Sequence, residues 1–191
     1  MNRFLTFIFV FYLIPSLAQE DFSDNYLNSK TLSVVDQKKI TKFLKTADKE
    51  LVSILLLSTD CPISKNYINK IKGFINSYGE TVSFFFYLTK NTSGFEKSLF
   101  AKEYEIDFEL RIDRKNKLAT LLGATVTPEI LLIKKEEGKI LYQGAIDNWY
   151  YSLGKKRNVI TSNYFEEAVK LSLNNKKVSI PYVQPVGCYI E

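Results

Sequence analysis

The stretch LVSILLLSTDCPIS, residues 51–64, determines how we expect the rest of the chain to fold. Its first seven residues are apolar except for Ser53. Such a short, evenly apolar run is typical of a strand buried on both faces, as in a parallel sheet. Turn residues end the strand, and Pro62 suits the first turn of a helix because its missing N–H costs no hydrogen bond there. We therefore expect Cys61 where a buried strand meets a helix N-terminus.

This position predicts a reactive thiol. Free N–H groups and the helix dipole stabilise anions at a helix N-terminus, and a thiolate is such an anion. Lys65, one turn further on, adds positive charge, whereas the neighbouring carboxylate of Asp60 raises the pKa of a thiol. We expect a modestly lowered pKa for Cys61, which makes it the candidate nucleophile. The alternative is that Cys61 is half of a stabilising disulfide.

The composition indicates one globular domain without a basic stripe. The chain has 191 residues, of which 46% are hydrophobic, and this is enough for a single domain with its own core. The formal charge is +5 and the pI is near 9.0. The basic residues are scattered singly and in pairs among acidic ones. This pattern indicates a solvated surface, and we expect no nucleic-acid partner.

The absence of histidine and the small number of cysteines restrict the chemistry. The sequence has no histidine and only two cysteines, Cys61 and Cys188. This composition excludes Cys–His and Ser–His catalytic pairs, histidine-ligated metals and c-type haem, and it disfavours structural zinc. We expect neither a metal nor a cofactor.

The N-terminus has the pattern of a signal peptide over residues 1–18. Arg3 precedes an apolar run of 11 residues, well short of the ~20 that a spanning helix needs. The small residues of Ser16-Leu17-Ala18 fit a cleavage site. An uncleaved anchor is the alternative. We expect export to the periplasm or the extracellular space, where disulfides persist, and no membrane contact after cleavage.

The remaining apolar patterns divide the chain into a loose arm (19–32), one domain (33–176) and an irregular tail (177–191) that carries Cys188. Within the domain we expect a long loop over 148–161, with Trp149, Tyr150 and Tyr151 either lining a groove or covering the core. The predicted strands are 51–58, 82–88, 108–112, 130–133 and 140–142, and the predicted helices are 40–44, 62–78 (closed by a left-handed Gly79), 95–104, 115–122 and 163–173.

The element order, β-α-β, helix, β-hairpin, helix, resembles that of the thioredoxin-fold superfamily. Four motifs carry the resemblance to its exported redoxin branch: Cys61-Pro62-Ile63-Ser64, Thr127-Pro128, Gly144-Ala145-Ile146-Asp147 and Pro185-Val186-Gly187-Cys188-Tyr189-Ile190. The resemblance implies an α/β, thioredoxin-like fold. In such a fold a central mixed β-sheet is flanked by helices, here with an N-terminal helical extension and a C-terminal tail.

The resemblance also implies a substrate site. Thr127-Pro128 resembles the cis-proline motif that faces the active-site cysteine, and X-Pro is the only peptide bond that is commonly cis. By this resemblance an extended substrate peptide pairs with the backbone of Thr127, with Pro62 and Ser64 completing the site. An ordinary trans proline that opens an edge strand is the alternative.

Ser64 departs from the dithiol motif, which has its second cysteine at this position. A mixed disulfide at Cys61 must then be resolved by a thiol from elsewhere. Cys188 is the only internal candidate, and we expect it on a flexible tail, beside Gly187, that can swing onto the Cys61 helix terminus. An external thiol is the alternative.

The resemblance favours a thiol–disulfide oxidoreductase that acts on protein thiols or disulfides, or with an external reductant, in redox homeostasis. One alternative is a peroxiredoxin-like, antioxidant peroxide reductase. Ser58 has the spacing of the residue that precedes a peroxidatic cysteine, but Pro128 stands where the arginine is expected. Another alternative is a non-catalytic domain with a permanent Cys61–Cys188 disulfide. Copper delivery is disfavoured because the chain lacks a close cysteine pair and a histidine.

Overall fold

The computed structural model describes residues 39–41, 43–89 and 92–191. The predicted signal peptide (1–18), the arm (19–32) and the predicted start of the domain at residue 33 lie outside these ranges.

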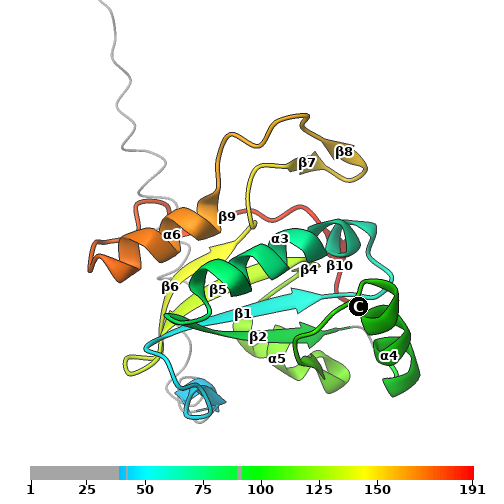
Figure 1. The fold of residues 1–191 in the computed structure, drawn as a ribbon, viewed down its shortest axis with the longest axis horizontal. Coiled ribbons are helices and arrows are strands. Elements are labelled where there is room, and N and C mark those ends of the chain that lie inside the picture. Colours follow the sequence, from blue (N-terminus) through cyan, green and yellow to red (C-terminus); the bar gives the residue numbers. More distant parts are fainter. Residues whose placement is uncertain (1–38, 42, 90–91) are drawn as a thin grey trace, which may run out of the picture.

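A mixed β-sheet forms the centre of the molecule (Figure 1). Within the described residues it has six strands, with β1 (Leu51–Leu57) parallel to β2 (Val82–Leu88) and antiparallel to β5 (Glu129–Lys134). This arrangement confirms the predicted fold class. The strands are, in spatial order, β3 (Leu110–Ile112), β2 (Val82–Leu88), β1 (Leu51–Leu57), β5 (Glu129–Lys134), β6 (Lys139–Gly144) and β9 (Tyr182–Val183).

The central strand β1 is buried along its whole length, as its apolar sequence predicted. Alternate side chains enter two separate hydrophobic clusters, because successive residues of a strand point to opposite faces of the sheet. Leu51, Leu55 and Leu57 belong to one cluster, and Val52, Ile54 and Leu56 belong to the other.

Helices cover both faces of this sheet (Figure 1). On one face α3 (Pro62–Tyr78) and α6 (Tyr164–Leu173) pack into the first cluster. On the other face α5 (Lys117–Leu122), which follows a short 3₁₀ turn, packs with the helical residues 39–41 and 43–44. The helix α4 (Gly94–Glu103) contributes Phe100 to the first cluster.

Three helices have sequence signals at their ends, and one predicted cap, at Gly79, differs from the structure. Pro62 is the first residue of α3, and Ser93 and Glu96 form a capping box at the start of α4. Gly123 ends α5 in the left-handed conformation, but Gly79 does not, which corrects the prediction. The Gly79 N–H still donates a helical bond to the Ile75 carbonyl at 2.8 Å, so the chain leaves α3 without a left-handed residue.

Two regions that we predicted to be irregular contain short strands. The loop over 148–161 contains the hairpin of β7 (Tyr150–Ser152) and β8 (Lys155–Lys156). The tail contributes β9 to the sheet, and β10 (Cys188–Tyr189) pairs separately with β4 (Val126–Thr127). Strands of two or three residues are too short to produce a recognisable alternation in the sequence.

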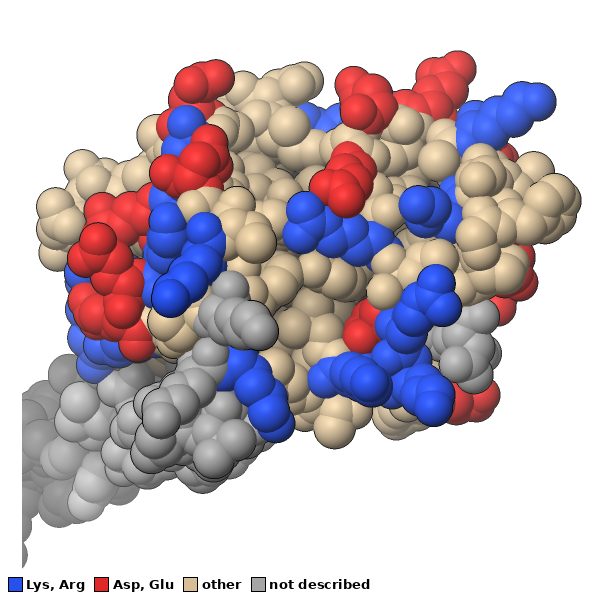
Figure 2. All heavy atoms as spheres, turned by 90° about the horizontal axis from the view of Figure 1, so that it is seen from below, with Lys and Arg blue, Asp and Glu red and all other residues tan. Residues whose placement is uncertain are grey.

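The surface carries both signs of charge. On the face shown in Figure 2, lysine and arginine side chains occur among aspartate and glutamate side chains. Over the described ranges, no helix has the length and apolar character needed to cross a bilayer.

We predict that removing one buried aromatic ring will destabilise the fold strongly. Phe165 of α6 is completely buried, so Phe165→Ala should lower the free energy of unfolding by about 3–5 kcal/mol. Phe95→Ala is the matched control because that ring is 76% exposed, and it should change the value by less than about 0.5 kcal/mol. Urea denaturation measures both, and equal effects would contradict the described packing.

Candidate active site

Cys61 lies at the N-terminal tip of α3, as the sequence predicted. It is the N-cap residue, with an extended backbone at φ −82° and ψ 114°, and its carbonyl accepts the first helical bond from the Lys65 N–H at 3.1 Å. The residue is only 1% exposed. The buried strand β1 ends four residues earlier, so the core fixes the position of this sulfur.

The sulfur points toward the proline-containing turn between β4 and β5. The Cys61 thiol donates a hydrogen bond to the Thr127 carbonyl, with 3.1 Å between sulfur and oxygen. The Thr127–Pro128 peptide bond is cis, as the resemblance implied. Residues 66 positions apart in the sequence therefore meet at one site.

The C-terminal tail completes the site from the other side. Cys188 lies opposite Thr127 in the antiparallel pairing of β10 with β4, and Tyr189 lies opposite Val126. The Ile190 N–H donates to the Thr125 carbonyl at 3.0 Å, which extends the pairing by one bond. The end of the tail is therefore a paired strand, in contrast to the irregular, flexible tail that we expected.

The two cysteines influence each other. Burial raises the pKa of the Cys61 thiol, but hydrogen bonding from the Cys188 side chain, followed by the backbone of Ser64, outweighs this effect. The backbone of Cys188 and the Ser64 hydroxyl lower the pKa further, so the pKa of Cys61 lies below its ordinary value. The direction agrees with the expectation, but the second sulfur contributes to it as well as the helix terminus. Both residues are free thiols in this structure.

The serines around Cys61 form a buried network. The hydroxyl oxygen of Ser64 accepts a bond from the Ser58 N–H at 3.2 Å, and the Ser58 hydroxyl oxygen accepts one from the Asp60 N–H at 3.3 Å. Ser64 is completely buried beside Cys61, at the position of the second cysteine in a dithiol motif. The two other residues of α3 that we predicted to belong to the site are less buried: Pro62 is exposed, and Lys65 is half-buried. In the described part of the chain, the Lys65 ammonium makes no hydrogen bond or ion pair.

Solved structures share this architecture. A hypothetical protein from Sinorhizobium meliloti matches with a TM-score of 0.62 and 21% identity, over 80% of this chain and 82% of that chain. A protein from Neisseria meningitidis, provisionally described as a thioredoxin, matches with a TM-score of 0.51 and 17% identity, over 66% and 76% of the two chains. A protein from Chlorobium tepidum, provisionally described as the thiol:disulfide interchange protein DsbE, matches at 0.50 and 16%, over 69% and 83%.

The chain has the thioredoxin fold. The structural matches confirm the fold that the resemblance implied. No protein-family model matches the sequence, and no curated protein matches it. At these identities the matches establish the fold, so the roles of individual residues depend on the geometry of this chain.

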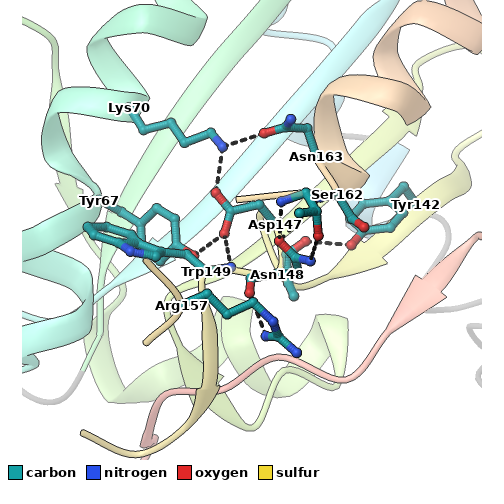
Figure 3. A network of polar contacts seen from close by, with 11 residues as sticks. Tyr67, Lys70, Tyr142, Asp147, Asn148, Trp149, Arg157, Ser162 and Asn163 are labelled. Carbon is teal, nitrogen blue, oxygen red and sulfur yellow. Dashed lines mark hydrogen bonds and ion pairs between the residues drawn. The ribbon is translucent and has the colours of Figure 1, made fainter. Parts of the chain in front are cut away.

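A buried carboxylate, Asp147, is the centre of a polar network that includes residues of α3 (Figure 3). It accepts bonds from the Tyr67 hydroxyl at 2.5 Å, the Lys70 ammonium at 2.5 Å and the Trp149 N–H at 2.7 Å. Lys70 also donates to the Asn163 side chain at 2.7 Å. Burial raises the pKa of Tyr67, and its bond to Asp147 adds to the increase. The network joins α3, the base of the β7–β8 hairpin and the start of α6.

A second buried carboxylate, Glu129, lies directly behind the cis-proline. Its side chain accepts bonds from the Gln143 amide at 2.6 Å and from the Thr125 N–H at 3.2 Å. Sequence reasoning missed the roles of Glu129 and Asp147. A usable signal was present, because Glu129 comes directly before four apolar strand residues, and an acidic residue is rarely buried in such a place without partners. These bonds hold the start of β5, directly after Pro128.

Two of the three aromatic residues after Asp147 have the predicted core-covering role. Trp149 and Tyr150 pack against the first hydrophobic cluster, and both rings contact Tyr67 of α3, at centroid distances of 5.4 and 6.1 Å. Tyr151 is 54% exposed. No cluster of three or more potential metal ligands occurs among the residues that the structure describes.

We predict that the donor group at position 188 sets the pKa of Cys61. Cys188→Ala removes a donor to the thiolate, so the thiolate loses stabilisation and the pKa of Cys61 should rise. Cys188→Ser is the matched control because its hydroxyl still donates, and it should retain a lower pKa than Cys188→Ala. The measurement is the pH midpoint of Cys61 alkylation in each variant. Equal midpoints would show that the side chain at 188 does not influence the thiol.

Proposed function

We propose that this protein is a thiol–disulfide oxidoreductase in which Cys61 is the nucleophile and Cys188 is the resolving thiol. The observation that carries the proposal is that both cysteines meet at Thr127: the Cys61 thiol donates to the Thr127 carbonyl at 3.1 Å, and Cys188 pairs opposite Thr127 in β10. The DsbE-like protein from Chlorobium tepidum is consistent with this chemistry on the same fold.

The reaction begins when the Cys61 thiolate attacks a substrate disulfide. A bond forms between Cys61 and one substrate sulfur, and the substrate disulfide breaks, releasing the other sulfur as a thiolate. The Cys188 thiolate then attacks the Cys61 sulfur, forming the Cys61–Cys188 disulfide and releasing the second substrate thiolate. The protons of the two protein thiols balance those taken up by the two substrate thiolates. The substrate is reduced by two electrons and the protein is oxidised by two.

An external dithiol must reduce the Cys61–Cys188 disulfide to close the cycle. Both steps are reversible, so the same residues oxidise a dithiol substrate when the oxidised protein is the starting state. Thr127 and the exposed Pro62 would contact the substrate, and the buried Ser64 would support the Cys61 thiolate. Export is part of the proposal and is supported by the signal-peptide pattern of residues 1–18.

The peroxide-reductase alternative has less support. A peroxidatic thiolate needs an arginine nearby, but Arg111 stacks on Phe85 and pairs with Glu109 at 2.9 Å. Arg114 is exposed on the 3₁₀ turn that precedes α5. The Ser58 hydroxyl accepts a bond from the Asp60 backbone.

The test is the reduction of insulin disulfides by the protein with a dithiol regenerant. Cys61→Ser should abolish turnover, because the attacking sulfur is lost. Cys188→Ser should still form a mixed disulfide in a single turnover but should accumulate it, because nothing inside the protein resolves it. The double variant Cys188→Ser, Ser64→Cys restores a second thiol next to Cys61 and should recover turnover.

Two results would contradict the proposal. Full activity in Cys61→Ser would show that Cys61 is not the nucleophile. Consumption of hydrogen peroxide that depends on Cys61 and exceeds the rate of disulfide reduction would instead support a peroxide reductase.

A further inference from the structure

We infer that the C-terminal strand β10 occupies the substrate-strand position, so that a polypeptide substrate reaches Cys61 only by replacing β10. The identity of the substrate rests on the proposed function, but the competition for this position does not. The inference concerns the edge of β4, the short strand that ends at the cis-proline.

The backbone of β4 is already paired in this structure. In the described residues β4 pairs with β10 alone, in a separate two-stranded ladder outside the main sheet. Cys188 lies opposite Thr127, and the Ile190 N–H bonds to the Thr125 carbonyl. An incoming extended polypeptide needs the same backbone groups, so the two strands cannot be bound together.

The sequence is built to allow this close approach. A Cβ atom on Gly187 would lie 2.2 Å from the carbonyl oxygen of Thr127 and 2.7 Å from its carbonyl carbon. Real contacts of that kind do not occur, so only glycine lets the tail run this close to β4. The pairing of the tail with β4 therefore requires glycine at position 187.

The tail is also held weakly enough to exchange. β10 has two residues, well below the usual strand length of about five to six. Beyond the ladder, Ile190 packs partly against the second hydrophobic cluster, and the Asn116 side chain bonds to the Glu191 carbonyl. Tyr189 is 74% exposed and adds little packing. A substrate strand that makes more contacts along this edge can displace such a short one.

The arrangement gives β10 two functions in one cycle. While it is paired, it helps to bury the Cys61 thiol, which is only 1% exposed. A substrate strand displaces it and forms the mixed disulfide with Cys61. When β10 pairs again, Cys188 returns beside Cys61, attacks it and releases the substrate thiol. The same strand therefore shields the Cys61 thiol and later supplies Cys188, which resolves the mixed disulfide.

The experiment measures access to Cys61 in the full chain. In a Cys188→Ser background, where Cys61 is the only thiol, Gly187→Ala should displace the tail and raise the rate of iodoacetamide labelling at least tenfold. Gly73→Ala is the matched control, because a Cβ on this exposed residue of α3 meets no atom within 4 Å, and it should leave the rate unchanged. Ile190→Ser loosens the tail from its other anchor and should also raise the rate.

Mixed-disulfide formation with insulin provides the second readout and should accelerate in the same two tail variants. Unchanged labelling in both Gly187→Ala and Ile190→Ser would overturn the inference. Circular dichroism identifies a variant that has unfolded, in which case the other variant decides. Because labelling needs no redox activity, faster labelling in the tail variants, combined with a failure of the unmodified protein to reduce insulin, would retain the inference and reject the proposed function.

Discussion

The site depends on a short antiparallel pairing between the C-terminal residues Cys188–Tyr189 and the strand Val126–Thr127. This pairing brings the second cysteine to the first across 127 positions of sequence, the difference between 188 and 61. It also covers the carbonyl of Thr127, to which the Cys61 thiol donates. Without the pairing, Cys61 would be a single thiol at a helix tip, because Ser64 stands where a local partner is expected.

The lowered pKa of Cys61 results from opposing effects on its thiolate. Burial disfavours the charged form, and full burial can raise the pKa of an acidic group by several units. The donors around the sulfur reverse that effect, and each pKa unit of reversal corresponds to about 1.36 kcal/mol of extra stabilisation of the thiolate. The Cys188 side chain makes the largest of these contributions, so the strand that covers Cys61 also lowers its pKa.

The sequence was informative wherever a pattern was long or local. The apolar run 51–57 predicted a strand buried on both faces, and Pro62 placed Cys61 at the tip of a helix. Thr127-Pro128 identified the turn that faces the sulfur. These signals are sufficient to predict the fold and the part of the candidate site formed by Cys61 and the Thr127-Pro128 turn.

The remaining features depend on contacts between distant residues. The two-residue strand β10 has no period of its own, and its place is set by pairing with β4 and by the close approach at Gly187. The buried carboxylates Glu129 and Asp147 gain their partners from strands and helices elsewhere in the chain. Single-sequence patterns contain no information about such partners, which is why the tail was expected to be irregular.

A redox titration of the full chain tests the central claim most directly. The protein is equilibrated in buffers of defined thiol–disulfide potential, and the Cys61–Cys188 disulfide is quantified by mass spectrometry. The account predicts that this disulfide forms with a midpoint between about −120 and −270 mV, the range of exchange proteins. A midpoint below about −300 mV would indicate a permanent structural bridge, and failure to form the bond would contradict the account.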